Sequence, residues 1–285
     1  MRESRLSLRF CSLLLLTPLH SLLALALSLL ITRYSTMSLP IDLAVIGGSG
    51  LYKFPGLENT ERHAVNTPYG VASGDVVLGD FAGKRVAFMA RHGESHSLPP
   101  HRVNYRANLW ALHSLGARQV IGVNAVGGIR ADMGPRVIVV PDQIIDYTHG
   151  RYTSYCDVEG AEVKHIDFSE PYTRALRQAL VAAAADAGIA VIDGGCYGAT
   201  QGPRLETRAE IARMKRDGCD LVGMTGMPEA ALARELEIDY ACLALVANFA
   251  AGCGDEEEIS IEEIFAHLAA ATAEVPNILA ALLKS

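Results

Sequence analysis

Two polar residues, Glu206 and Asn248, carry side chains that could recognise the edge of a purine base. Glu206 lies in the segment QGPRLETRAE, and Asn248 lies near the end of the apolar segment YACLALVANF. A carboxylate and an amide complement the N1–H donor, the O6 acceptor and N7 of a 6-oxopurine, whereas a 6-aminopurine reverses the first two groups. An unpaired buried polar group costs about 1–3 kcal/mol, which is enough to decide between the two bases. If both side chains share one pocket, they predict a 6-oxopurine site.

Each of these two residues also has an ordinary structural interpretation. Glu206 directly precedes the helical pattern TRAEIARM, and an acid at a helix N-terminus is stabilised by the helix dipole. Asn248 ends a strand pattern, where asparagine commonly begins a turn. Taken singly, either residue fits its structural interpretation as well as the functional one.

Glycines and basic residues follow predicted strands, an arrangement that suits a bound anion. In IGGSGLY the glycines let the backbone approach an anion, and Ser49 adds a hydroxyl. In ARHGESH, Arg91 stands beside His92, and a guanidinium binds phosphate in a fork. The segment VNAVGGI repeats the order of strand, polar residue and glycines. The alternatives are a tight strand turn for the first segment and a salt-bridged surface turn for the second.

Metal and dinucleotide sites are poorly supported. His92 and His96 are four residues apart, but HGESH lacks the acid and the helical context of the zinc motif HExxH. IGGSG is not GxGxxG, and no acid follows about 20 positions later at the end of a second strand. The six cysteines form no CxxC pair, which favours reduced cytosolic thiols over a zinc site or a disulfide framework. We therefore predict no metal.

The elements that must position these residues alternate between strands and helices. The β-branched, apolar segments predict strands at residues 41–47, 85–91, 119–127, 137–147 and 240–249. The amphipathic segments predict helices at residues 103–116, 170–188, 207–218, 229–238 and 261–284, the last broken near Pro276. This alternation indicates a single α/β domain with a largely buried sheet, in which ligands collect at the carboxyl ends of strands. Ser49, Arg91, Asn124 and Asn248 fall at such ends.

Composition excludes several function classes. Half of the 285 residues are hydrophobic and 20% are charged, which predicts a sizeable core rather than disorder. The formal net charge is −7, and no basic stripe follows the extreme N-terminus. This balance argues against a nucleic-acid partner and favours a small-molecule site.

The first 36 residues form an apolar N-terminal extension. Arg2, Arg5 and Arg9 precede an apolar run over residues 11–31, which is long enough for a signal sequence or a membrane anchor. The alternative is that Met37 is the true start and that residues 1–36 are an over-extended reading frame. We favour the second interpretation, with a cytoplasmic domain over residues 37–285. A membrane location is expected only if residues 1–36 are translated.

Six segments, taken in order and spacing, resemble one family. IGGSG, ARHGESH, VNYRANLWAL, HIDFSEPY, QGPRLETRAE and MTGMPE are similar to the purine nucleoside phosphorylase superfamily, trimeric branch, and more narrowly to methylthioadenosine phosphorylases. The similarity runs over residues 41–270. It implies a homotrimer and a central mixed, mostly parallel sheet flanked by helices. It also implies phosphorolysis of a nucleoside, with inorganic phosphate as co-substrate and no metal or organic cofactor.

The resemblance assigns roles position by position. For phosphate it implies Ser49, Arg91, His92, Asn124, Ala125 and Thr225, although a threonine is usual where Asn124 stands. For the nucleoside it implies Met224 under the ribose, Leu205 and Ala250 at the base, and Glu206 and Asn248 as the catalytic base-binding pair. At the 5′ end of the sugar it implies His96, Ile261 and a neighbouring subunit's His165.

Two departures from the methylthioadenosine enzymes bear on the substrate. Those enzymes typically have a serine where this chain has Glu206, and TDYD where it has ANFA (residues 247–250). The 6-oxopurine phosphorylases carry glutamate and asparagine at the two places, as here. A methylthio 5′ pocket joined to a 6-oxopurine pocket predicts S-methyl-5′-thioinosine as substrate. The alternatives are a methylthioadenosine phosphorylase, a general 6-oxopurine nucleoside phosphorylase, or a nucleoside-binding receptor without turnover.

Overall fold

Long apolar parallel strands form the centre of the fold. In the computed structural model, which describes residues 40–158, 160–254 and 261–285, β1 (Leu43–Gly47) lies between β4 (Lys84–Ala90) and β5 (Gln119–Gly128). Both pairings are parallel, and β11 (Asp239–Phe249) pairs in parallel with β5 along nearly its whole length. These four strands agree with the sequence-based predictions. The predicted extension over residues 1–36 lies outside the described residues.

Shorter strands extend this sheet at both edges, and most of them were not predicted. They are β2 (Glu58–His63), β3 (Val76–Phe81), β6 (Ile138–Val140), β7 (Gln143–Asp146), β8 (Ile192–Asp193), β9 (Cys196–Ala199) and β10 (Leu221–Gly223). The strand predicted over residues 137–147 is two strands, because β6 pairs with β11 and β8 whereas β7 pairs with β9. Pro141 stands between them and cannot donate to a ladder. Parallel pairs outnumber antiparallel pairs among the described strands, which confirms a mixed, mostly parallel sheet.

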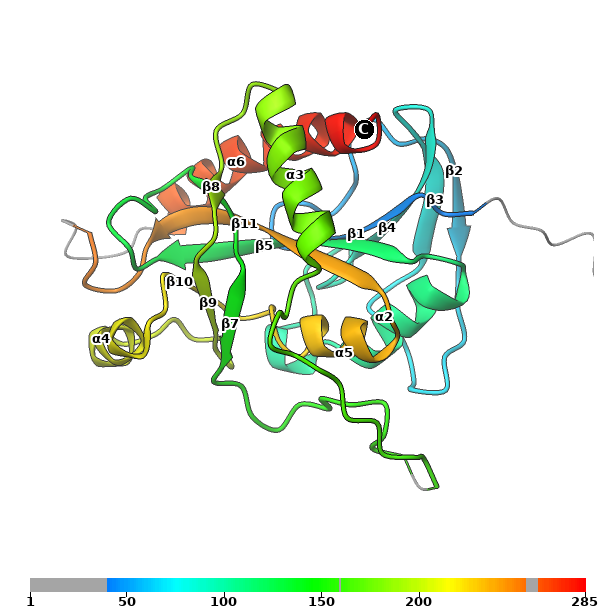
Figure 1. Cartoon of the computed structure of the whole chain (residues 1–285), viewed down its shortest axis with the longest axis horizontal. Helices are drawn as coiled ribbons and strands as arrows, with labels where there is room; N and C mark the ends of the chain where they lie inside the picture. Colours follow the sequence, from blue (N-terminus) through cyan, green and yellow to red (C-terminus); the bar gives the residue numbers. More distant parts are fainter. Residues whose placement is uncertain (1–39, 159, 255–260) are drawn as a thin grey trace, which may run out of the picture. The chain divides into compact units, whose positions relative to one another are not determined.

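Helices cover both faces of this sheet (Figure 1). On one face pack α2 (Tyr105–Ser114) and α5 (Glu229–Glu235), and on the other pack α3 (Arg174–Asp186) and α6 (Ile261–Leu282). Residues of β1 alternate between the two cores, with Ile46 facing α2 and α5 and Val45 facing α3 and α6. A sheet covered on both faces explains why its central strands are apolar throughout. The short 3-10 helix η1 (Pro100–Arg102) precedes α2, and α4 (Arg208–Asp217) packs under β9 and β10.

The last helix differs from its prediction, because α6 continues through Pro276. Proline inside a helix removes one backbone hydrogen bond and usually breaks or kinks it. Here Val275, Ile278 and Leu279, which flank the proline, are completely buried against β11 and α3, and this packing holds the helix together. Among the described residues, the stretch Glu262–Leu282 also has the length and apolar composition of a membrane span. The core helix of a folded domain can have the same length and composition, and one face of α6 is packed in that way.

Strand directions bring several loops to the middle of β5. The strand β1 ends beside it, β4 ends beside β1, and β10 runs antiparallel to β5, from Gly128 back towards Val126. The residues after β10 therefore lie beside Asn124. The sequence placed Asn124 and Asn248 at strand ends, but both lie inside strands, β5 and β11 respectively.

Candidate active site

The loops that follow β1, β4, β9 and β10, together with β5, β11 and α6, enclose a cavity of about 550 Å³. Ten residues predicted from the sequence line it: Ser49, His92, His96, Ala125, Leu205, Glu206, Met224, Thr225, Asn248 and Ala250. The two base-binding candidates and most of the phosphate-binding candidates therefore share one cavity. That shared location was the assumption on which the 6-oxopurine prediction depended.

The glycine turn after β1 lets two segments approach closely. A Cβ atom at Gly48 would lie 2.5 Å from the carbonyl oxygen of Val123 and 2.9 Å from Arg91 Nη1, so no side chain fits there. The next residue, Ser49, lines the cavity and is half-buried. The segment IGGSGLY is therefore both a tight turn and part of the cavity wall.

Arg91 lies behind the cavity wall. Its side chain is completely buried, and its Nε and Nη2 atoms donate to the two carboxylate oxygens of Glu229 at 2.8 and 2.7 Å. Nη1 donates to the carbonyl oxygen of Val123 at 2.9 Å. Burial alone would lower the pKa of Arg91, but the Glu229 carboxylate raises it above its ordinary value, so the guanidinium stays charged. The structure thus places Arg91 behind the cavity lining, and direct phosphate binding by it stays a prediction.

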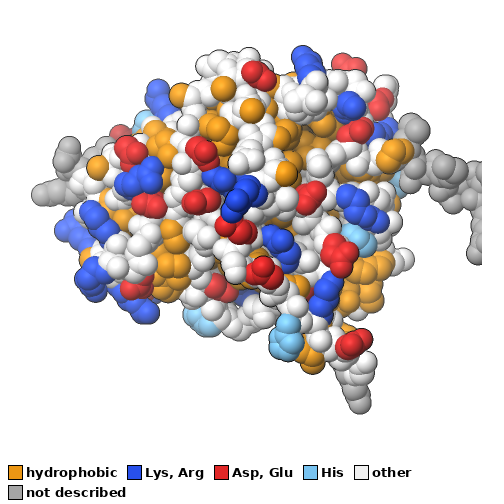
Figure 2. Space-filling model, in the orientation of Figure 1, with side chains coloured by type: hydrophobic (Ala, Val, Ile, Leu, Met, Phe, Trp, Pro, Cys, Tyr) orange, Lys and Arg blue, Asp and Glu red, His pale blue; other side chains and the backbone are white. Residues whose placement is uncertain are grey.

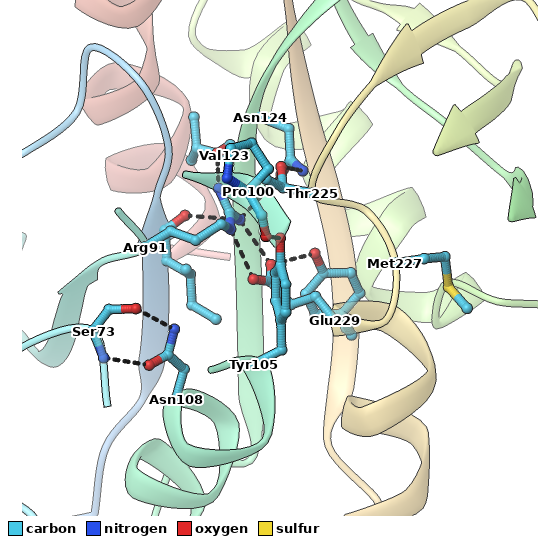
Figure 3. A network of polar contacts seen from close by, with 12 residues as sticks. Ser73, Arg91, Pro100, Tyr105, Asn108, Val123, Asn124, Thr225, Met227 and Glu229 are labelled. Carbon is cyan, nitrogen blue, oxygen red and sulfur yellow. Dashed lines mark hydrogen bonds and ion pairs between the residues drawn. The ribbon is translucent and has the colours of Figure 1, made fainter. Parts of the chain in front are cut away.

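A chain of hydrogen bonds connects Arg91 to the cavity (Figure 3). Arg91 Nη2 lies 3.3 Å from Asn124 Oδ1, and Asn124 Nδ2 donates to Thr225 Oγ1 at 2.8 Å. Asn124 is completely buried, whereas Thr225 lines the cavity. Since the Thr225 oxygen already accepts from Asn124, its own O–H is left to donate to an anion in the cavity. The sequence predicted that Asn124 contacts phosphate. In the structure Asn124 does not line the cavity but hydrogen-bonds to Thr225, which does.

His92 faces the cavity as a neutral imidazole. Its Nδ1 lies 2.8 Å from the carbonyl oxygen of Leu98, which can only accept, so Nδ1 carries the proton and Nε2 is left as an acceptor. Burial, together with the charge of neighbouring Arg91, lowers the pKa of His92 to about 4. His92 can therefore accept a proton or a hydrogen bond from a protonated oxygen, but it adds no positive charge near neutral pH.

Glu206 and Asn248, the predicted base-binding pair, both line the cavity. Thr200 Oγ1 donates to Glu206 Oε1 at 2.6 Å, and this hydrogen bond restricts the orientation of the carboxylate. Asn248 follows a register shift between β11 and β5 at residues 246–248, and such a bulge re-aims the side chains beside it. The Asn248 Nδ2 atom donates to the carbonyl oxygen of Phe249 at 2.6 Å, which leaves Oδ1 and the second N–H for a ligand.

The part of the cavity predicted to hold the sugar is mostly apolar. Met224 lines it from the loop after β10, and three residues of α6 complete it: Ile264, Phe265 and Leu268. His96 lies at the rim, where its Nδ1 is 3.2 Å from the Tyr52 hydroxyl oxygen. His96 has a φ of +53°, a left-handed conformation that is uncommon outside glycine. Leu205 also lies at the rim, with 46% of its surface exposed.

Besides Arg91 and Asn124, which lie behind the wall, two predicted residues are not among those that line this cavity. His165 is exposed on the segment before α3 and is not among the lining residues, which agrees with its assignment to a neighbouring subunit but does not test it. Ile261 is the first residue of α6, and its side chain lies outside what the structure describes. Within the part of the chain that the structure covers, no group of three or more His, Cys, Asp or Glu side chains could hold a metal ion.

Three residues important to the site were not singled out from the sequence: Thr200, Glu229 and Tyr240. Glu229 is completely buried and also accepts a 2.8 Å hydrogen bond from the Tyr240 hydroxyl. Its signal was an acid opening the apolar helix EAALA, directly after the segment MTGMP. Thr200 directly precedes the segment QGPRLE, but a threonine there has no distinctive pattern.

Known proteins share both the sequence pattern and the fold of this chain. The Phosphorylase superfamily matches residues 42–284, nearly all of the described chain. The chain belongs to this superfamily. The fold agrees with that membership. A methylthioadenosine phosphorylase from an antarctic soil metagenomic library, 36% identical, has a TM-score of 0.81 and covers 87% of this chain and 86% of its own.

Members of the superfamily with closer sequences carry several specific names. A probable S-methyl-5′-thioinosine phosphorylase of Xanthomonas campestris is 57% identical over 86% of this chain and 98% of its own length. A probable 6-oxopurine nucleoside phosphorylase of Thermococcus kodakarensis is 47% identical over 74% of this chain and 80% of its own. The resemblance to the purine nucleoside phosphorylases is thus confirmed.

Proposed function

We propose that this chain catalyses phosphorolysis of S-methyl-5′-thioinosine, giving hypoxanthine and 5-methylthioribose 1-phosphate. One observation carries the proposal: Glu206 and Asn248 line the same cavity as Ser49 and Thr225. A 6-oxopurine reader and an anion-binding end thus face one ligand space. The name of the Xanthomonas campestris relative, a probable S-methyl-5′-thioinosine phosphorylase, supports the same substrate.

The reaction begins with inorganic phosphate beneath C1′. The hydroxyls of Ser49 and Thr225 donate to phosphate oxygens, and the backbone beside Ala125 adjoins them. Neutral His92 accepts a hydrogen bond from a protonated phosphate oxygen through Nε2, the acceptor that its bond to Leu98 leaves free. The charge of Arg91 acts on this end through Asn124 and Thr225. Asn124 holds the Thr225 hydroxyl before the substrate arrives, as electrostatic catalysis requires.

Bond breaking moves an electron pair onto the base. The bond between C1′ and N9 lengthens first, the sugar becomes oxocarbenium-like, and a phosphate oxygen then captures C1′. Glu206 accepts from N1–H, and Asn248 donates to O6. The leaving purine anion takes up a proton at N7 from water, and N7–H then donates to Asn248 Oδ1. The contacts at O6 and N7 strengthen as negative charge reaches the purine, so they lower the barrier rather than only the Michaelis constant.

The apolar lining at the sugar end favours a methylthio group over a hydroxyl at the 5′ position. Its walls on α6 are Ile264, Phe265 and Leu268, all apolar. A hydroxyl facing these three side chains would lose hydrogen bonds to water, with His96 at the rim as the one polar lining residue assigned to that end. A general 6-oxopurine nucleoside phosphorylase is the second candidate, because relatives so named are 47% identical and the base end suits any 6-oxopurine nucleoside.

We also propose a cytoplasmic homotrimer that needs no metal or organic cofactor. The segment before α3 is exposed and carries His165 together with apolar Tyr152 and Val163, which are 67% and 69% exposed. By the family resemblance, this segment packs against a neighbour in the trimer and places His165 at the 5′ end of the neighbour's cavity. Light scattering, and the activity of a His165→Ala variant, test this part.

The test of the proposed function is a substrate panel with and without phosphate. Purified chain is incubated with methylthioinosine, methylthioadenosine or inosine, and the released bases are separated by chromatography. Release of hypoxanthine from methylthioinosine should require phosphate and far exceed release of adenine from methylthioadenosine. Equal rates for the two would refute the base assignment, and faster turnover of inosine would favour the second candidate. Binding without any turnover would identify a receptor.

A further inference from the structure

Two substrate-binding loops leave the sheet side by side. The strands β9 and β10 are parallel neighbours, so they end at the same edge. After β9 comes the base loop, residues 200–206, which contains Glu206. After β10 comes the ribose loop, residues 224–228, which contains Met224 and Thr225. For catalysis these loops must keep a fixed spacing, because one contacts the base and the other contacts the sugar and phosphate.

Arg151 binds both loops at once. Its Nη2 donates to the carbonyl oxygens of Thr200 and Gln201, at 3.2 and 2.8 Å. Its Nη1 donates to the carbonyl oxygens of Met224 and Met227, at 2.9 and 2.6 Å. One guanidinium therefore spans the gap between the two strand ends, with the base loop on one nitrogen and the ribose loop on the other.

The remaining contacts of Arg151 hold the guanidinium itself. Nε donates to Gln201 Oε1 at 3.1 Å, and Nη1 lies 3.3 Å from the Tyr105 hydroxyl. The hydroxyl of Tyr105 in turn donates to the carbonyl oxygen of Pro100, a residue of the cavity wall. The protein acceptors of these bonds are all neutral. The charge of Arg151 thus strengthens hydrogen bonds to the loops instead of pairing with an acid.

The two loops touch each other and leave no room for a larger side chain. Gly202 of the base loop has a φ of +61°, and a Cβ there would lie 2.4 Å from Met224 Sδ. This close contact fixes the distance of approach from one side, while Arg151 prevents separation from the other.

We propose that Arg151 is a positioning residue that sets the spacing of the base loop and the ribose loop. This deepens the proposed function and rests on it. Without the guanidinium, the two loops separate. Glu206 then cannot contact N1–H at the same time as Met224 lies under the ribose. A displacement of about 1 Å in a substrate-positioning group can cost about a hundredfold in rate. Lysine cannot replace arginine, because one ammonium has no planar fork to span two strand ends.

The experiment compares Arg151→Ala and Arg151→Lys with the unmodified protein. Both variants should lose about a hundredfold in kcat/KM for the nucleoside. The KM for phosphate should change less than kcat/KM for the nucleoside, because Ser49 lies outside both loops and Thr225, in the ribose loop that Arg151 binds, is also held by Asn124 of β5. Millimolar guanidinium chloride, compared with sodium chloride, should restore part of the activity of Arg151→Ala by occupying the vacated space.

Arg177→Ala is the matched control. Arg177 has 12% of its side chain exposed, donates to the carbonyl oxygens of Val140 and Pro141, and pairs with Asp193. None of these residues lines the cavity. It should keep near-normal kcat/KM. Wild-type kcat/KM in either Arg151 variant, an equal loss in Arg177→Ala, or no specific guanidinium rescue would overturn the proposal.

Failure of the proposed function would be distinct. It would show first as absence of turnover by the unmodified protein on all three nucleosides. Calorimetric titration with hypoxanthine in the presence of phosphate would then test Arg151 alone. Equal affinity in the unmodified protein and in Arg151→Lys would contradict the role of Arg151, and clearly weaker binding by the variant would support it.

Discussion

Thr200 Oγ1 donates to Glu206 Oε1 at 2.6 Å, and the same oxygen lies 3.3 Å from the carbonyl oxygen of Gly223. The Thr200 backbone N–H also donates to that carbonyl, at 2.8 Å. The Glu206 carboxylate, which we propose binds the base, is therefore tied to the end of the sheet rather than free on its loop. A hydrogen bond of this kind restricts the carboxylate to one orientation before substrate binds.

Replacing this hydroxyl should weaken base recognition. Thr200→Val keeps the shape of the side chain but removes the donor, and hydrogen bonds to charged groups contribute about 1.5–3 kcal/mol. We expect kcat/KM for the 6-oxopurine nucleoside to fall at least about tenfold. Steady-state kinetics at saturating phosphate measures this, with Thr200→Ser as the control that retains the hydroxyl. Equal kinetics for the serine and valine variants would show that Glu206 needs no such support.

Changing Asn248 should alter the choice of base. Asn248→Asp removes the amide that donates to O6 and supplies a carboxylate suited to the amino group of a 6-aminopurine. The ratio of adenine release from methylthioadenosine to hypoxanthine release from methylthioinosine should rise by about tenfold or more. Competition between the two nucleosides in one reaction measures this ratio directly. An unchanged ratio would assign base selectivity to other residues of the cavity.

Removing the charge of Glu229 should destabilise the fold. Glu229→Gln leaves Arg91 charged, completely buried and without its anionic partner. Breaking one side of a buried ion pair costs about 3–5 kcal/mol. We expect that loss in the free energy of unfolding measured with urea, together with a higher KM for phosphate.

The matched control for Glu229 is an exposed ion pair. Glu170 pairs with Arg174 at 2.9 Å, and the two side chains are 54% and 68% exposed. Glu170→Gln should cost no more than about 1 kcal/mol, since surface pairs contribute little. If the two glutamine variants unfold at the same urea concentration, the buried pair does not stabilise the fold as described.

His92 should make stability fall in mildly acidic solution. Burial lowers its pKa to about 4, from 6.5 in the unfolded chain, so between these pH values only the unfolded state binds the proton. The free energy of unfolding therefore rises with pH through this window and loses this contribution as pH falls. The His92→Gln variant should show a shallower dependence, and the exposed His149→Asn should match the unmodified protein. Identical slopes in all three proteins would contradict the buried neutral imidazole.

The sequence predicted the parts of the site that depend on local pattern. Ser49, His92 and Thr225 each follow a recognisable strand or motif, and all three line the cavity. Glu206 and Asn248 are 42 positions apart in the chain, and only the sheet order brings them to one cavity. Their shared location was therefore an assumption at the level of the sequence, because no local pattern encodes the order of the strands.

The sequence could not show which residues lie behind the cavity wall and support it. Arg91 follows a strand and has the chemistry of a phosphate clamp, yet its partner Glu229 lies 138 positions later. Nothing in the spacing shows that this acid reaches the guanidinium from α5. The role of Arg151 was missed for a related reason, since its acceptors are backbone carbonyls and carry no residue-type signal. The unbroken α6 shows the same limit, because burial around Pro276 outweighed the local rule.

Gly122 of β5 limits how the residues around the Arg91–Glu229 pair can change in evolution. A Cβ at Gly122 would lie 2.2 Å from the Tyr240 hydroxyl oxygen and 2.9 Å from Glu229 Oε1. A mutation that added any side chain there would displace the phenol that donates to Glu229, and the charge pair would lose that support. Divergence at these positions must therefore follow an order, in which Tyr240 becomes smaller before Gly122 becomes larger. Lineages that keep the tyrosine should keep the glycine.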